Sequence, residues 1–299
     1  MAVPPGPGRF GAVLTAMVTP FGADGELDLD AAAKLARWLV DQGNDGLVVA
    51  GTTGEAPVLS DDEKSQLWRA VSEAVSVPVI AGAGTYDTRH SLELVRRAEE
   101  AGAAGILAVG PYYNRPSQAG IEAHFRAMAG ATSLPVMLYD VPSRTGKRIA
   151  HDVLVRLFSE VDNIVAFKDA TGDPASAARL VAELGDAMEL YSGDDGMTLP
   201  LLAVGARGVV GVSSHWCAPE FAEMIAAFFK GDVETAREVN ARMLESFAWE
   251  NTEQSPYSVS AKAMLRTLGH AVGACRLPNG PTPPGIEDQA RDIYERLRG

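Results

Sequence analysis

One lysine in this sequence stands where a nucleophilic amine would be useful. Lys168 ends the apolar run Ile164–Phe167 and is followed by a turn that contains Gly172. An unbroken apolar run of this kind is typical of a strand buried on both faces. A lysine held in apolar surroundings has a lowered pKa, so its neutral, nucleophilic form becomes accessible near pH 7. On this segment alone, a lysine that extends to the surface is the commoner arrangement, so other residues must decide.

Further polar groups follow other apolar runs in the same way. They are hydroxyls, phenols and a guanidinium, with two backbone positions beside them: Thr52, Thr53, Tyr112, Tyr113, Tyr139, Arg144, Gly193 and Val210. Together with an amine, these groups suit a keto acid, since the amine can form an imine and a guanidinium fork binds a carboxylate. Each also has an ordinary alternative as a turn residue, a packed aromatic ring or a surface charge.

Metal chemistry is not indicated by the sequence. The five histidines are scattered without a ligand pattern, and Cys217 and Cys275 lack metal-type spacing. The pair Asp194-Asp195 could bind a divalent ion, but a loop-anchoring or capping role is the commoner one. We expect no metal and no cofactor.

The polar groups follow a regular alternation of apolar runs and helical stretches. The runs cover 13–18, 46–50, 77–81, 105–109, 134–139, 164–168, 188–191 and 208–212. Such alternation predicts an α/β fold with parallel strands, and eight units of this size predict a (β/α)8 TIM barrel. An open doubly wound sheet is disfavoured because no Gly-x-Gly-x-x-Gly follows the first run. In a barrel the active site lies at the C-terminal ends of the strands, which would bring these groups together.

The remainder of the chain is predicted to be helical, over 219–230, 233–248, 258–267 and 285–298. We expect residues 1–218 to form the barrel with an N-terminal tail, and residues 219–299 to form a helical C-terminal extension packed on it. The Pro/Gly-rich start, Met1–Arg9, lacks the pattern of a signal peptide and is expected to be a frayed tail.

Composition excludes some partners. The net charge of −13 argues against nucleic acids and anionic membrane surfaces. No run approaches ~18 apolar residues, so no transmembrane helix is expected. Two cysteines without a supported pairing favour a reducing compartment, and we expect a cytoplasmic protein.

Five motifs in order carry a family resemblance: Gly51–Glu55, Pro111–Pro116, Leu138–Gly146, Phe167–Gly172 and Ser192–Asp195. On these motifs the sequence resembles the pyruvate-dependent class I aldolases of the dihydrodipicolinate synthase and N-acetylneuraminate lyase group. The double threonine, the paired tyrosines and Arg144 resemble the synthases more than the lyases. Gly110, Asp140 and Gly211 depart from the pattern, in which threonine, asparagine and serine are common.

The resemblance implies a lyase that condenses pyruvate with aspartate semialdehyde in the diaminopimelate route to lysine. Lys168 would form a Schiff base with pyruvate, and Tyr139 beside it would move protons during imine formation. Thr52 would link Tyr139 to Tyr113 in a proton relay. Tyr113 would come from a neighbouring subunit, which implies a homotetramer built as a dimer of dimers.

The resemblance also implies the substrate contacts. Thr53 would hold the pyruvate carboxylate, and Arg144 would bind the carboxylate of the aldehyde. Gly193 and the carbonyl of Val210 would position substrate and lysine. Two alternatives stay open: a related Schiff-base aldolase or dehydratase for a sugar acid or another 2-keto acid, and a non-catalytic barrel that binds a keto acid.

Lysine-inhibited members of the family bind lysine in a cleft between subunits. The matching positions here are Ala56, Asp61, Lys64, Tyr86 and His90. His90 replaces a glutamate that would accept an ammonium group, and Lys64 adds a like charge. We therefore expect lysine to inhibit weakly or not at all.

Overall fold

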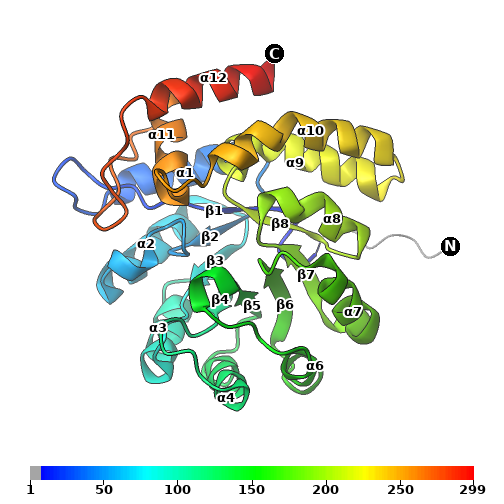
Figure 1. The fold of residues 1–299 in the computed structure, drawn as a ribbon. Coiled ribbons are helices and arrows are strands. Elements are labelled where there is room, and N and C mark those ends of the chain that lie inside the picture. Colours follow the sequence, from blue (N-terminus) through cyan, green and yellow to red (C-terminus); the bar gives the residue numbers. More distant parts are fainter. Residues whose placement is uncertain (1–7) are drawn as a thin grey trace.

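The protein, seen in a computed structural model that describes residues 8–299, is a closed barrel of eight parallel strands (Figure 1). Each strand pairs with its neighbours in chain order, and β1 pairs with β8. The strands are β1 (Val13–Ala16), β2 (Gly46–Val49), β3 (Val79–Gly82), β4 (Gly105–Val109), β5 (Val136–Asp140), β6 (Ile164–Asp169), β7 (Glu189–Ser192) and β8 (Gly208–Gly211). The predicted TIM barrel is confirmed. Residues 1–7 of the expected N-terminal tail lie outside the described residues.

Helices that follow the strands surround the barrel on the outside (Figure 1). They are α1 (Leu29–Asp41), α2 (Asp61–Ala74), α3 (Thr88–Glu100), α4 (Gln118–Ala129), α5 (Pro142–Thr145), α6 (His151–Glu160), α7 (Pro174–Leu184), α8 (Thr198–Ala203) and α9 (Ser214–Phe229). Short 3-10 helices occur at η1 (Ala56–Val58), η2 (Gly185–Ala187) and η3 (Asp195–Met197). Among residues 8–299, no helix is long and apolar enough to cross a membrane.

The hydrophobic core has two layers because successive strand residues face opposite sides. Met137 and Tyr139 of β5 and Ala166 of β6 belong to a cluster inside the barrel. Phe167 belongs to the larger cluster between the barrel and its helices. Lys168, one residue further, therefore points into the barrel, at the end where the strands finish.

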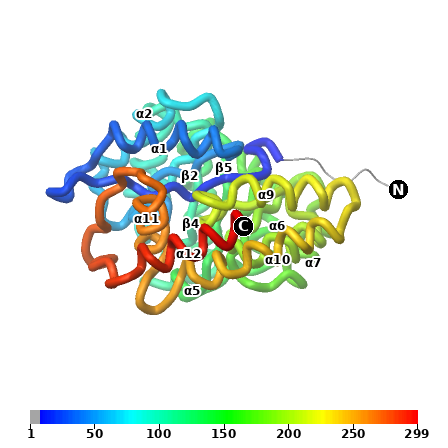
Figure 2. The backbone as a smooth tube through the Cα atoms, turned by 90° about the horizontal axis from the view of Figure 1, so that it is seen from above, coloured from blue at the N-terminus to red at the C-terminus, as the bar shows by residue number. Residues whose placement is uncertain are grey.

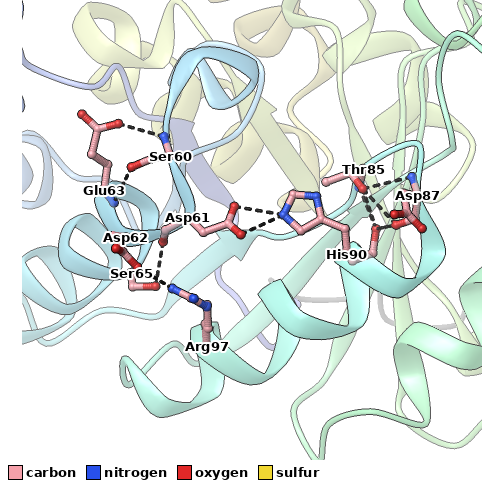
Figure 3. A network of polar contacts seen from close by, with 10 residues as sticks. Ser60, Asp61, Asp62, Glu63, Ser65, Thr85, Asp87, His90 and Arg97 are labelled. Atoms are coloured by element: carbon pink, nitrogen blue, oxygen red, sulfur yellow. Dashed lines mark hydrogen bonds and ion pairs between the residues drawn. The ribbon is translucent and has the colours of Figure 1, made fainter.

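Helix α2 shows how local sequence sets the boundaries of these elements. The N-cap Ser60 accepts a hydrogen bond from the Glu63 N–H at 3.2 Å, and Glu63 Oε2 accepts one from the Ser60 N–H at 2.8 Å (Figure 3). This reciprocal capping box satisfies two N–H groups at the helix start. The pattern Ser60-x-x-Glu63 in the sequence therefore sets where α2 begins.

The C-terminal region packs beside α9 on one side of the barrel. It contains α10 (Val233–Trp249), α11 (Tyr257–Thr267) and α12 (Ile286–Arg298), and α10 lies along α9 (Figure 2). Helix α9 begins at Ser214, earlier than the predicted 219, and packs against β1 and β8 as the eighth helix of the barrel. The expected boundary between the barrel and the C-terminal extension, after residue 218, falls inside this helix. We therefore propose that the extension begins after α9.

Candidate active site

Lys168 and Tyr139 lie side by side inside the mouth of the barrel. They are register partners on β6 and β5, and Lys168 Nζ lies 4.4 Å from the centroid of the Tyr139 ring. Only 5% of the surface of each residue is exposed. Burial lowers the pKa of Lys168 to about 8, while the nearby carboxylate of Asp195 acts in the opposite direction. The amine is thus poised to be nucleophilic near neutral pH.

A cavity of about 110 Å³ opens onto the Lys168 amine. It brings together six of the residues singled out in the sequence and several others: Thr52, Thr53, Tyr139, Val141, Ser143, Arg144, Lys168, Ala170, Gly193, Asp194, Val212, Asn251 and Tyr257. The side chain of Val210 is not part of this lining, since it packs in the inner core of the barrel. The predicted role of its carbonyl stays a prediction.

A second cavity of about 210 Å³ adjoins the first. Thr52, Tyr139 and Arg144 line both cavities, so they stand at the boundary between them. Tyr112 lines the second cavity and packs edge-on against Tyr86, with ring centroids 5.4 Å apart.

Tyr139 carries its proton at neutral pH. Burial raises the pKa of Tyr139 to about 12, with Arg144 and a hydrogen bond from the Thr52 side chain acting in the opposite direction. A phenol this weakly acidic exchanges protons efficiently only through hydrogen-bonded partners. The contact with Thr52 supplies one such partner.

Arg144 is presented by α5, a single helical turn after β5. Pro142 begins the turn, where its fixed φ suits a first helical position, and Gly146 ends it at a φ of 70°. The Arg144 guanidinium lies 5.6 Å from the centroid of the Tyr257 ring. Its side chain is exposed, so its fork remains accessible to an anionic ligand.

Gly193 makes room for the lysine side chain. A Cβ at this position would lie 2.9 Å from Lys168 Cγ and 3.0 Å from its Cε. Its N–H donates to the Asp169 carbonyl at 2.8 Å, which fixes the end of β7 beside β6. Any larger residue here would displace the amine from its position.

The pair Asp194-Asp195 anchors loops. Asp194 caps η3 by accepting from the Gly196 N–H at 3.0 Å. Asp195 Oδ2 accepts from the N–H groups of Val212 and Ser213 at 2.8 and 3.0 Å. These contacts agree with the anchoring interpretation. Among residues 8–299, no group of three or more His, Cys, Asp or Glu side chains is arranged to hold a metal ion.

Two of the three departures from the family pattern, those at positions 211 and 140, have local explanations. A Cβ at Gly211 would lie 2.1 Å from Asp195 Oδ1, so the buried carboxylate excludes a serine there. Asp140 accepts from the Ile149 N–H at 3.0 Å, and burial raises the pKa of Asp140 to about 7. A carboxyl group that holds its proton near neutral pH resembles the uncharged asparagine it replaces.

Tyr113 does not join the site within one chain. Its residue surface is 93% exposed, and its φ of 71° places a non-glycine residue in the left-handed region. Neither cavity includes it among its lining residues. An exposed, strained aromatic residue of this kind is an interface candidate.

Comparison with models of protein families identifies the family to which this chain belongs. Residues 9–296 match the model of the dihydrodipicolinate synthetase family. The chain belongs to this family. It is 52% identical to the 4-hydroxy-tetrahydrodipicolinate synthase of Acidothermus cellulolyticus, and the match covers 98% of this chain and 92% of that protein.

Solved structures of the family share the fold closely. A dihydrodipicolinate synthase from Bacillus anthracis is 42% identical with a TM-score of 0.92, covering 96% of this chain and 98% of that one. One from Cyanidioschyzon merolae, solved with lysine bound, is 41% identical with a TM-score of 0.93, covering 97% and 98%. The match extends through the C-terminal helices, so those helices are a shared part of the family fold.

The C-terminal helices supply two cavity residues that the sequence did not predict. Asn251 follows α10, and Tyr257 begins α11. Burial raises the pKa of Tyr257, and the carboxylates of Glu250, Asp194 and Asp195 add to this effect. The cavity residues that the sequence predicted follow apolar strand runs. Asn251 and Tyr257 do not follow such runs, so this pattern could not predict them.

Proposed function

We propose that the chain condenses pyruvate with aspartate semialdehyde through a Schiff base on Lys168. The observation that best supports this proposal is the buried amine of Lys168. Its pKa is lowered, it lines the cavity, and it lies 4.4 Å from the centroid of the Tyr139 ring. The names of the curated relatives support this reaction. The test is a coupled assay with pyruvate and aspartate semialdehyde, with sugar-acid aldehydes as competing substrates.

The chemistry begins with attack of the neutral Lys168 amine on the keto carbon of pyruvate. Loss of water gives an imine whose nitrogen accepts electrons, so the adjacent methyl group releases a proton and becomes an enamine. Tyr139 and Thr52 carry protons to and from the leaving hydroxyl. The enamine then attacks the aldehyde carbon, and the amine of the second substrate closes the ring and releases Lys168.

The carboxylates of the two substrates occupy different parts of the site. Thr53, which is 3% exposed, lines the small cavity beside Lys168 and holds the pyruvate carboxylate. Arg144 lies where the two cavities adjoin and holds the carboxylate of the aldehyde. Gly193 and the Val210 carbonyl position the lysine and its adduct.

Replacing Arg144 with alanine is expected to weaken use of the aldehyde about tenfold to a hundredfold. A hydrogen bond to a charged group contributes about 1.5–3 kcal/mol, which corresponds to this loss. The measurement is kcat/KM for each substrate with the other saturating. Arg148→Ala is the matched control, because Arg148 pairs with Asp173 and lines neither cavity. Equal losses for both substrates would contradict the assignment.

Lysine is expected to inhibit only above about 1 mM. Inhibition in this range corresponds to a binding free energy weaker than about −4 kcal/mol. Figure 3 shows His90 Nε2 in contact with both carboxylate oxygens of Asp61, and each distance is 2.9 Å. An ammonium ligand must therefore compete with a contact already made. The Cyanidioschyzon merolae relative was solved with lysine bound and is the matched comparison. A titration at saturating pyruvate that gives cooperative inhibition below 1 mM would refute the expectation.

The proposed assembly is a homotetramer made of two dimers, with Tyr113 reaching the site of its neighbour. The exposure and left-handed backbone of Tyr113 support this, since the residue contributes nothing to its own cavity. We also place the protein in the cytoplasm. Cys217 and Cys275 are free thiols, which a reducing compartment preserves.

A further inference from the structure

A buried ion pair lies next to the threonine turn of the active site. Glu55 Oε1 lies 2.7 Å from Lys262 Nζ of α11, and neither side chain has any exposed surface. Removing two charges from water costs several kcal/mol per ion, so such a pair is weak grounds for stability alone. The pair therefore calls for another explanation.

The backbone of Glu55 continues the turn that carries Thr52 and Thr53. Its φ of 58° lies in the left-handed region, which costs a residue with a Cβ about 1–2 kcal/mol. Its N–H donates to the Thr52 carbonyl at 3.1 Å, and the Gly54 carbonyl accepts from the Thr19 hydroxyl at 2.6 Å. Strain of this kind persists only where surrounding contacts determine the conformation.

Those contacts come from the C-terminal region of the chain. Glu55 Oε2 accepts from the Arg276 N–H at 2.9 Å and from the Asn279 amide at 3.4 Å. Lys262 Nζ also donates to the Ala274 carbonyl at 3.0 Å. The carboxylate is thus held by α11 and by the segment that follows it.

Phe21 completes the enclosure of this ion pair. Its ring centroid lies 4.2 Å from Lys262 Nζ and also 4.2 Å from the Arg276 guanidinium carbon. Its N–H donates to the Val272 carbonyl at 3.2 Å. Both cations therefore rest on an aromatic face and keep a fixed position beside the carboxylate.

We infer that Glu55 is a positioning residue, which together with Lys262 of the C-terminal region holds the turn that aims Thr52 and Thr53 at the substrate. The inference rests on the proposed function, in which Thr53 binds the pyruvate carboxylate and Thr52 relays protons. It gives α11 a role in pyruvate binding through Glu55, in addition to Tyr257, the residue that α11 places in the cavity.

The test compares Lys262→Met, Glu55→Gln and the double variant. Lys262→Met leaves the buried carboxylate without its cation, so the turn should shift and pyruvate binding should weaken at least tenfold. In the double variant a neutral amide still accepts from the Arg276 N–H, so at least a threefold recovery over Lys262→Met is expected. The readout is the pyruvate concentration needed for half-maximal borohydride trapping on Lys168, measured well below each melting temperature. This readout does not involve the aldehyde.

Arg298→Met is the matched control. Arg298 anchors α12 through Glu220 and the Trp216 carbonyl, away from the threonine turn. The Arg298→Met variant should have a lower melting temperature, and its pyruvate binding should stay within twofold of that of the unmodified protein. If Lys262→Met and Glu55→Gln also lower the melting temperature and leave pyruvate binding within twofold, the pair is only structural and the inference is wrong. If Lys262→Met does not fold, Glu55→Gln alone decides between the same two outcomes. Absence of any Lys168 adduct in the unmodified protein would instead overturn the proposed function.

Discussion

Lys168→Ala is expected to lose turnover by at least about a thousandfold while the barrel stays folded. Removing a covalent nucleophile abolishes the intermediate, and losses of this order or larger are typical of such residues. Loss of the side chain also removes a buried amine whose pKa is lowered by burial, so the folded state should not be destabilised by an unpaired charge. The measurements are the coupled assay and a thermal melt of the same preparation.

The adduct identifies the residue directly. Borohydride with pyruvate should add a reduced three-carbon acid to Lys168, located by mass spectrometry of peptides. Lys64 and Lys262 are internal controls, since both are buried and burial lowers the pKa of each. A lowered pKa alone would label these lysines too. Labelling at either of them, or no label in active protein, would refute the mechanism.

The rate of trapping should depend on pH with a definite sign. Only the neutral amine attacks, and the pKa of Lys168 is lowered to about 8, so the trapping rate should rise as pH increases and level off above about 8. For a lysine with an unperturbed pKa, the trapping rate would keep rising until the pH reached about 10.4. A rate that is constant between pH 6 and 9 would contradict the shifted amine.

Much of this site could be predicted because strand ends in a barrel meet at one place. Lys168 and Tyr139 each end an apolar run, and the register of β5 and β6 brings them together. Arg144 was found by motif, although the one-turn helix α5 that presents it was not predicted.

Other parts depend on contacts between distant segments, which no local pattern encodes. Tyr257 lines the cavity from the start of α11, a helix that packs against α9 and α12, and its own sequence surroundings show only a helix start. The same holds for Glu55, whose motif indicated a turn but not its partner Lys262. The predicted helix began too late, at residue 219, because α9 begins at Ser214 and accommodates Pro219 internally.

Tyr113→Phe is expected to lower turnover strongly, by about a hundredfold, because general acid–base groups typically contribute a factor of 10²–10⁴. The change removes only the hydroxyl, and the ring is already exposed, so the folded state of a single chain should be unaffected. Tyr86→Phe is the matched control, since Tyr86 is also exposed and lines neither cavity.

Hybrid subunits then locate the hydroxyl. If Tyr113 acts in the neighbouring site, a dimer of one Tyr113→Phe subunit and one Lys168→Ala subunit keeps one intact site, in which the first subunit supplies Lys168 and the second supplies Tyr113. Random mixing in equal amounts makes about half of the dimers hybrid, so about one quarter of the original activity should return. If Tyr113 acts within its own chain, every site in the hybrid lacks one group and no activity returns. Hybrids proved by native mass spectrometry yet inactive would therefore show that the site is not shared.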